Sequence, residues 1–262
     1  TLSPRYGWVL DFMTNLCGQL AQRRHEVSVF STNIDWERTL DVPLGRPILV
    51  NGVKVEYFPV QNLSVSLLRR FAFSWPIARA LWRRVREFDI VHVHSLYLFP
   101  ALAASYSCRA AGLPYIISPH GVLDPFTHRK NRIIKNLYLT LFARRDLNHA
   151  AAVHFMTQGE FEWAKSFGVT APAVVVNWAI DFDKYRRIPL PGAFSSRYPA
   201  AAGKRLIVYL GRIAYSKGLD LLARAFGRVA QTHQDTYLVL VGPDHEGYGA
   251  KVQSVLSEEG VL

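Results

Sequence analysis

The chain contains little sulfur, with two cysteines and two methionines among its 262 residues. Cys17 and Cys108 lie far apart and form no C-x-x-C pair, which argues against a disulfide framework and a zinc ribbon and favours a reducing compartment. Long hydrophobic runs are also missing. One of the longest apolar stretches, from Leu96 to Ser107, is interrupted by Pro100 and is too short to span a bilayer. No basic-then-apolar leader follows Thr1. We therefore expect a cytoplasmic globular protein.

Acidic residues are outnumbered, 20 against 31 basic ones, which gives a net charge of +11. Residues 1–190 hold 23 basic and 14 acidic residues, a net charge of +9, whereas residues 191–262 contribute only +2. The first region should therefore attract an acidic partner. No helix-turn-helix, KH or RRM signature accompanies the charge, so nucleic acid is not the expected partner.

Half of the residues are hydrophobic, and apolar β-branched runs alternate with helical patterns. This alternation predicts parallel sheets with helices on both faces, an α/β fold of Rossmann type. The expected strands are 27–30, 53–58, 90–93, 115–117, 152–155, 174–176, 206–210 and 238–241. A stretch rich in Pro, Ser, Gly and Ala predicts three parts: a first domain at 1–188, a linker at 189–204 and a second domain at 205–262.

The segment after Leu206 predicts a buried strand, a glycine turn at Gly211 and a helix rich in leucine. Arg212 and Lys217 bracket the start of that helix. Free backbone N–H groups and the helix dipole already favour an anion there, and the two cations would complete its charge balance. The pattern fits a diphosphate site, and equally an ordinary turn with solvated cations.

Several motifs resemble, in order, those of family 4 glycosyltransferases of the GT-B fold. They are Pro4-Arg-Tyr-Gly7, His25-Glu-Val, Asp89-Ile-Val-His-Val-His94, Ser118-Pro-His-Gly-Val-Leu-Asp-Pro125, Gly211-Arg-x4-Lys-Gly218 and Leu238-Val-Leu-Val-Gly-Pro243. The 118–125 loop is similar to that of the bacterial polysaccharide branch. Six ordered matches over nearly the whole chain are more specific than any one of them.

The resemblance implies two Rossmann-like domains with a cleft between them. It also implies an enzyme of polysaccharide biosynthesis, which transfers a hexosyl group from a nucleotide-diphosphate sugar to a glycan or lipid-linked acceptor with retention of configuration. It implies that the acceptor attacks from the face that the leaving group departs from. Gly211, Arg212, Lys217 and Gly218 would bind the donor and stabilise its diphosphate without a metal or cofactor. Gly7, His94 and His120 would lie on the acceptor side, with His120 beside the transferred sugar.

His92 and His94 lie two apart on an expected strand, so their rings should point to one face. Such a pair can ligate zinc, but no third ligand follows at a familiar interval, and we expect a sheet strand with His92 in the core. Asp181-Phe-Asp183 resembles a metal-binding D-x-D, but in the family this Asp is structural, so no metal is assigned. Glu160 matches a family glutamate and equally suits the N-terminus of a helix.

The chain also departs from the family. Trp8 stands where a second glycine is usual, and Asn177-Trp178 replaces an Asn-Gly pair. A first buried strand and the donor-binding E-x7-E segment are not in the sequence, so we expect both ends to be cut and the second domain to be incomplete. These departures favour an alternative, a non-catalytic GT-B-like partner subunit.

Residues 67–86 combine six arginines with Phe, Trp and Leu. As an amphipathic helix this segment would bind an anionic membrane surface, with help from the basic cluster at 128–135, and the protein would be peripheral at the inner face of the cell membrane. A basic membrane-surface binding protein is thus a further alternative. A solvated helix face packed on the sheet explains the pattern equally well.

Overall fold

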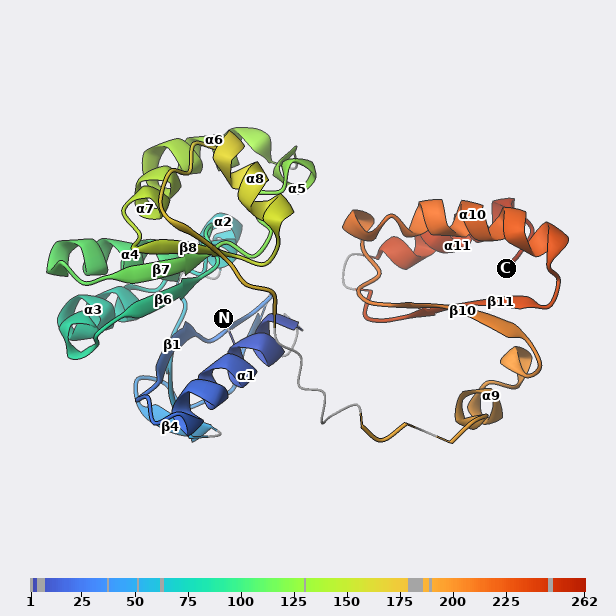
Figure 1. Ribbon diagram of the computed structural model, residues 1–262, viewed down its shortest axis with the longest axis horizontal. Helices are drawn as coiled ribbons and strands as arrows, with labels where there is room; N and C mark the ends of the chain where they lie inside the picture. The colour runs from blue at the N-terminus through green and yellow to red at the C-terminus, as the bar shows by residue number, and fades with distance from the viewer. Residues whose placement is uncertain are drawn as a thin grey trace. The chain divides into compact units, whose positions relative to one another are not determined.

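The computed structural model describes residues 2–3, 8–36, 38–50, 52–61, 64–129, 131–178, 186–188, 190–244 and 247–262. The chain divides into two compact units, Thr1–Asp181 and Phe182–Leu262. The predicted linker at 189–204 contains a short helix, α9 (Ala193–Arg197), and a 3-10 turn, η5 (Pro199–Ala201). Each unit combines parallel strands with helices (Figure 1), so the predicted α/β class is confirmed.

The first unit contains two main sheets and a short hairpin. One sheet has the order β1-β5-β4, with β4 antiparallel to β5, and the other is the parallel sheet β6-β7-β8-β9. The strands are β1 (Ser28–Thr32), β2 (Ile34–Asp35), β3 (Arg38–Thr39), β4 (Pro47–Val50), β5 (Val53–Phe58), β6 (Val91–His94), β7 (Tyr115–Ser118), β8 (Ala152–Phe155) and β9 (Ala173–Val175). Each of the six strands predicted here is present within two residues of its expected ends.

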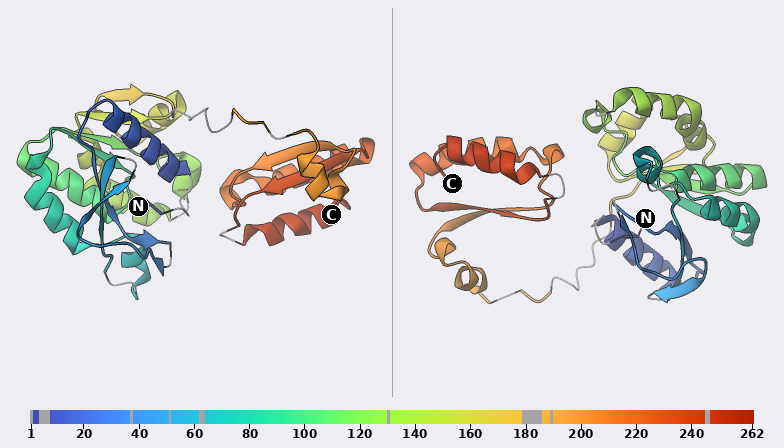
Figure 2. Two further views of the ribbon diagram at one scale, coloured as in Figure 1. Left: turned by 90° about the horizontal axis from the view of Figure 1, so that it is seen from below. Right: turned by 180° about the vertical axis from the view of Figure 1, so that it is seen from behind.

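Helices flank both sheets of this unit, with α1 beside β1 and β4, and α5 to α8 gathered near β8 (Figures 1 and 2). They are α1 (Trp8–Gln22), α2 (Ser66–Arg70), α3 (Trp75–Arg84), α4 (Phe99–Ala111), α5 (Pro125–Arg129), α6 (Arg132–Tyr138), α7 (Arg144–Asn148) and α8 (Gln158–Ser166), with a 3-10 turn η2 (Val85–Glu87) and a π-helical segment η3 (Leu139–Ala143). None of the helices in the described part of the chain is long and apolar enough to cross a membrane.

The expectation of one amphipathic helix over 67–86 was wrong. The segment forms α2 and α3, separated by Ala72 with a φ of 54°. The Ser74 hydroxyl accepts a hydrogen bond from the Ile77 N–H at 3.4 Å, and Pro76 lies in the first turn, so a new helix begins there. Ile77 and Leu81 are buried on its inner face, and the alternative of a helix packed on the core holds for α3.

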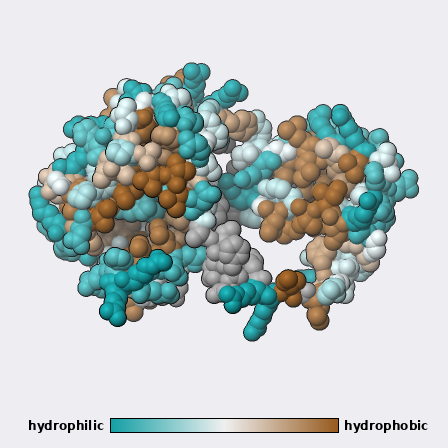
Figure 3. Space-filling model, viewed as in Figure 1, coloured by the Kyte–Doolittle hydropathy of each residue, from teal (hydrophilic) through white to brown (hydrophobic). Residues whose placement is uncertain are grey.

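The second unit pairs β10 (Arg205–Leu210) with β11 (Thr236–Val241) in parallel, as predicted. Helices α10 (Leu219–Thr232) and α11 (Tyr248–Glu258) lie on one side of the strands (Figure 2). Ile207, Leu238 and Leu240 pack toward the buried Leu219 and Val252. The other face of the strands exposes apolar side chains, namely Leu206, Val208, Leu210, Tyr237 and Val241. Figure 3 shows hydrophobic residues gathered over this unit.

A buried ion pair joins two helices of the first unit. Arg109 of α4 donates to the Asp146 carboxylate of α7, and their side chains are only 15% and 5% exposed. The Tyr115 hydroxyl donates to the Asp146 carbonyl oxygen at 2.7 Å. Removing one partner of such a pair leaves a buried charge without compensation.

We therefore expect Asp146→Ala to lower the free energy of unfolding by about 3–5 kcal/mol, measured by urea denaturation. Glu162→Ala is the matched control, because it breaks an ion pair with Lys165 in which both side chains are half exposed, and it should change stability little. Equal losses in the two variants would contradict the assigned role of the buried pair.

Candidate functional site

The carboxyl ends of three parallel strands meet at one edge of the second sheet. The register pairs His94, the last residue of β6, with Ser118, the last residue of β7. In open α/β sheets ligands bind at this edge. The sequence places His120 two residues beyond Ser118, so the topology brings His94 and His120 together.

The two imidazole rings of His94 and His120 are in direct contact. His94 Nδ1 and His120 Nε2 lie 3.0 Å apart, and the rings stack with an interplanar angle of 13°. His120 has a φ of 60°, and Gly121 follows with a φ of 74°. Two successive left-handed residues turn the chain sharply after Pro119, and this turn directs the His120 ring back onto His94.

A second chain of hydrogen bonds crosses the same edge through Ser118. His92 Nε2 lies 2.8 Å from Ser118 Oγ, which lies 2.8 Å from His154 Nδ1, and His154 Nε2 lies 2.9 Å from the Val176 carbonyl oxygen. A carbonyl only accepts, so His154 carries its proton on Nε2 when neutral. Ser118 then donates to His154 Nδ1 and accepts from His92 Nε2–H, which fixes all three groups.

Two aromatic side chains border the histidine pair. Phe12 of α1 lies edge-on to His94 and His120, with ring centroids 6.1 Å away in each case. Trp178 stacks on Phe12 at 5.1 Å and lies 5.9 Å from His120. Residues from the first helix and from the end of the first unit thus enclose one side of the pair.

Burial keeps the imidazoles of His92, His94 and His120 neutral. It lowers the pKa of His92 and of His120 to about 4, and neighbouring histidines add to the effect. The pKa of His94 lies well below its ordinary value, again mainly because of burial. At neutral pH each ring therefore has one donor and one acceptor nitrogen, which suits a sugar hydroxyl.

The prediction that His92 and His94 face the same side of a strand is confirmed, since their ring centroids are 4.0 Å apart. Among the residues that the structure describes, no group of three or more His, Cys, Asp or Glu side chains could hold a metal ion. Asp181, Asp183 and Gly7 lie outside the described residues.

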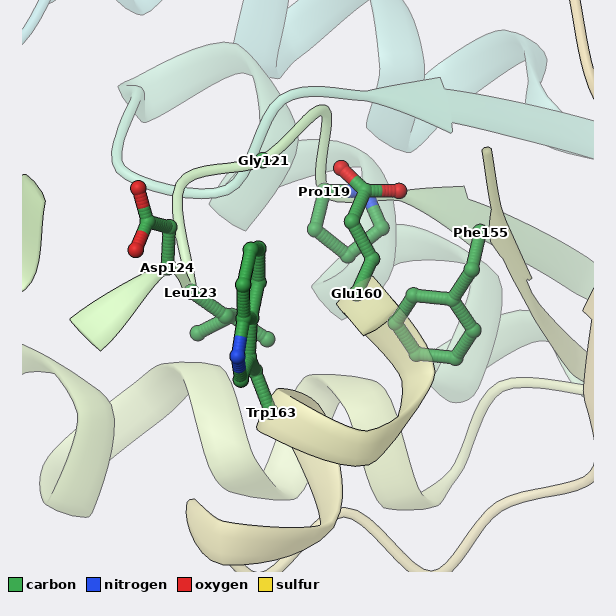
Figure 4. Close-up of a pocket in the computed structure, with 7 residues that line it drawn as sticks. All are labelled: Pro119, Gly121, Leu123, Asp124, Phe155, Glu160 and Trp163. Atoms are coloured by element: carbon green, nitrogen blue, oxygen red, sulfur yellow. The ribbon is translucent and has the colours of Figure 1, made fainter. Parts of the chain in front are cut away.

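A shallow pocket lies between the turn after His120 and helix α8 (Figure 4). Its lining residues are Pro119, Gly121, Leu123, Asp124, Phe155, Glu160 and Trp163. Glu160 Oε2 accepts from the Met156 N–H at 2.7 Å, while the Glu160 N–H donates to Thr157 Oγ1 at 3.2 Å. Glu160 thus caps the start of α8, and its other oxygen faces Gly121, where an added Cβ would lie 3.3 Å away.

In the second unit the predicted donor residues lie on one turn between β10 and α10. The Gly211 N–H donates to the Val241 carbonyl at 2.9 Å, and the Tyr209 hydroxyl donates to the Arg212 carbonyl at 2.9 Å. A Cβ on Gly242 would lie 1.8 Å from the Gly211 carbonyl oxygen, so glycine is required where the two strand ends meet.

The turn continues through a 3-10 segment, η6 (Tyr215–Lys217), to Gly218, which has a φ of 62° and precedes α10. Arg212 and Lys217 are exposed, and none of the ion pairs in the described part of the chain involves either. Two exposed cations therefore lie on the turn that leads into a fourteen-residue helix.

Sequence reasoning missed Ser118 and His154 as members of the histidine cluster, and it missed Phe12. The available signal was their position in the sequence, because His154 lies in the predicted strand 152–155 and Ser118 directly follows the predicted strand 115–117. Phe12 and Trp178 are far apart in sequence, and no motif links them.

Comparisons with known proteins agree with this arrangement. A family model described as "Glycosyl transferase 4-like domain" matches residues 11–178, and one described as "Glycosyl transferases group 1" matches residues 193–260. A subunit of the human phosphatidylinositol N-acetylglucosaminyltransferase is 24% identical over 240 residues, which cover 91% of this chain and 46% of that protein. The GDP-mannose:cellobiosyl-diphosphopolyprenol alpha-mannosyltransferase of Xanthomonas campestris is 25% identical over 207 residues, covering 77% of this chain and 50% of that protein.

Solved structures share the fold. HepE of Anabaena, in complex with UDP and glucose, has a TM-score of 0.62 at 19% identity, covering 80% of this chain and 54% of that one. An E. coli trehalose-6-phosphate protein bound with UDP-2-fluoro glucose has a TM-score of 0.61 at 13% identity, covering 99% and 67%. The chain spans about half the length of the curated relatives. It belongs to the family 4 glycosyltransferases of the GT-B fold, the family that its sequence motifs resemble.

Proposed function

We propose that this protein transfers a hexosyl group, with retention of configuration, from a nucleotide-diphosphate sugar to a hydroxyl of a glycan or lipid-linked acceptor in polysaccharide biosynthesis. The observation that carries the proposal is the glycine turn with exposed Arg212 and Lys217 at the start of α10. The names of two relatives support a lipid-linked acceptor, one being a phosphatidylinositol and the other a diphosphopolyprenol. The reaction would take place at the cytoplasmic face of the cell membrane.

The donor turn would stabilise the leaving diphosphate. The planar guanidinium of Arg212 offers several hydrogen-bond donors, and Lys217 offers a mobile ammonium group. The first N–H groups of α10 add the fixed positive charge of the helix N-terminus. Gly211 and Gly218 allow the backbone to approach the phosphates closely. Such charge stabilisation develops with the leaving group and requires neither a metal nor another cofactor.

The neutral histidine pair would act on the sugar side. His120, oriented by its contact with His94, would donate to or accept from a hydroxyl of the transferred sugar. The acceptor hydroxyl would then attack from the face that the diphosphate leaves. Gly7 belongs to the acceptor side of this proposal.

One contact favours a second candidate, a non-catalytic partner subunit. Trp178 stands where the family carries glycine, and its ring lies 5.9 Å from His120. A large ring there occupies space that a substrate would otherwise enter. This candidate predicts that the protein binds a partner protein but no nucleotide sugar.

Binding of UDP- and GDP-sugars separates the two candidates. We expect Arg212→Ala and Lys217→Ala each to cost about 1.5–3 kcal/mol, the value of a hydrogen bond to a charged group, so that each raises Kd roughly tenfold to a hundredfold in isothermal titration calorimetry. Arg228→Ala, an exposed arginine further along α10, should bind like the wild type. Absence of binding by the wild type to every sugar tested would favour the non-catalytic candidate.

Transfer activity tests the histidine pair. His120→Gln removes the imidazole from the sugar side, and His94→Gln removes its support; we expect each to lower kcat/KM by about tenfold, the worth of one hydrogen bond, in a sugar-transfer assay. His25→Gln, in an exposed position of the same unit, should leave transfer unchanged. An active His120→Gln variant would remove this residue from the proposal.

Stability should depend on pH because these rings are buried neutral. An unfolded histidine has a pKa of about 6.5, while burial lowers the pKa of His92 and His120 to about 4 in the folded protein. The unfolded state thus binds more protons between these values. Stability is complete above pH 6.5 and falls towards pH 4, by roughly 1–2 kcal/mol for each ring at pH 5. Urea denaturation should show that the free energy of unfolding falls less between pH 7 and pH 5 in His120→Gln than in His25→Gln. Equal falls in the two variants would refute the buried histidines as the origin of the pH dependence.

A further inference from the structure

Helix α6 lies on the outside of the first unit (Figure 1), and α6 and η3 together carry a ridge of exposed aliphatic side chains. Ile133, Leu137 and Leu141 are spaced four residues apart and are 84%, 59% and 56% exposed, and Ile134 beside them is 59% exposed. We call these four residues the aliphatic ridge. None of the residues of α6 is buried.

The ridge is not needed for the core beneath it. The inner face of the same helical stretch is formed by Leu139, Ala143 and Leu147, which are at most 3% exposed. Tyr138 packs between Phe71 and Tyr97. Since the inward side chains already fill the core, the outward ones are surplus to folding, and their exposure costs free energy unless something covers them.

The ridge is held firmly in place at its beginning. His128 of α5 is 5% exposed, and its Nε2 lies 2.7 Å from Asn136 Oδ1 of α6. The His128 ring also packs on Phe167 at 4.7 Å. These contacts fix α5 to α6, and Phe126 of α5 is 48% exposed.

The segment that carries the ridge is rich in basic residues and contains no acidic residue. Residues 125–145 contain six Lys or Arg and no Asp or Glu. Arg129 and Arg132 are exposed near its start. An amphipathic helix with aliphatic residues on one side and cations beside them is the arrangement that binds an anionic lipid surface.

The 67–86 segment is less suited to membrane binding than the aliphatic ridge. The apolar residues Ile77 and Leu81 of α3 are buried in the core, and Trp82 stacks on Tyr106 of the adjacent helix. Besides arginines, the segment exposes Leu67, Trp75 and Trp82, but these residues are divided between α2 and α3 and form no continuous aliphatic strip.

We propose that the aliphatic ridge, with Phe126, Arg129 and Arg132, docks on an anionic lipid bilayer. α6 lies along the membrane surface, its aliphatic side chains enter the boundary between headgroups and acyl chains, and the arginines pair with lipid phosphates. The turn that carries His120 leads directly into α5, so docking also brings a lipid-linked acceptor towards that turn. Membrane binding itself does not rest on the proposed transferase activity.

Vesicle flotation tests this with the full chain and no nucleotide sugar, so that its outcome is independent of donor binding. We expect binding to vesicles of phosphatidylcholine and phosphatidylglycerol that weakens with salt, and much less binding to phosphatidylcholine alone. The triple variant Ile133→Ser, Leu137→Ser, Leu141→Ser should lower partitioning at least about tenfold. Arg129→Gln with Arg132→Gln should lower it about tenfold on the anionic vesicles.

Two variants serve as matched controls and should bind like the wild type. Leu49→Ser removes a 74% exposed leucine from β4 of the same unit, and Arg79→Gln with Arg83→Gln removes charge from α3. Thermal unfolding of every variant checks the fold, and the arginine pair provides the test if the triple variant unfolds.

Several results would overturn the proposal: no vesicle binding by the wild type, unchanged binding by both ridge variants, or loss of binding only in the α3 variant. Conversion of a dimer to a monomer by the ridge variants, without loss of vesicle binding, would assign the ridge to a second copy of the chain instead.

Discussion

The parallel register of β6, β7 and β8 is the constraint on which the first unit's site depends. It sets His94 opposite Ser118 and brings β8, with His154, alongside. Every later contact follows from that alignment: Ser118 bridges two histidines, and the turn after it returns His120 to His94. A shift of one residue would send alternate side chains to the opposite face of the sheet and would separate all four rings.

Backbone proximity plays the corresponding role in the second unit. The ends of β10 and β11 approach so closely at Gly211 and Gly242 that a side chain on Gly242 would meet the neighbouring carbonyl. Tyr209 then holds the Arg212 carbonyl, and Gly218 begins the helix. The chemistry assigned to the turn therefore depends on residues that carry no charge. Arg212 and Lys217 stay exposed because the backbone, not an ion pair, shapes the turn.

The alternation of apolar β-branched runs with helical patterns was sufficient to predict the eight parallel strands and the start of α10, because strands of parallel sheets are typically continuous apolar runs. The antiparallel β4 was missed although Asn51-Gly52, a strong hairpin signal, joins it to β5. The break between α2 and α3 was missed because the arginines and apolar residues of 67–86 were assigned to one amphipathic helix, although Ser74 and Pro76 are typical of a helix start. His94 and His120 were predicted as acceptor-side residues, but Phe12 and Trp178 meet them only through tertiary folding, which leaves no local trace.

Trp178 shows how burial and access oppose each other at this edge. Its ring and that of Phe12 exclude water from one side of the histidine pair, and exclusion of water keeps the imidazoles neutral. A glycine in its place would open the edge and let water solvate the rings, which would raise the pKa of His120 towards its ordinary value. The same ring that narrows access therefore preserves neutral nitrogens that donate and accept hydrogen bonds, as the proposed contact with a sugar hydroxyl requires. Trp178 therefore has two opposite effects on the proposed sugar site: its ring narrows access, and it keeps water away from the histidines.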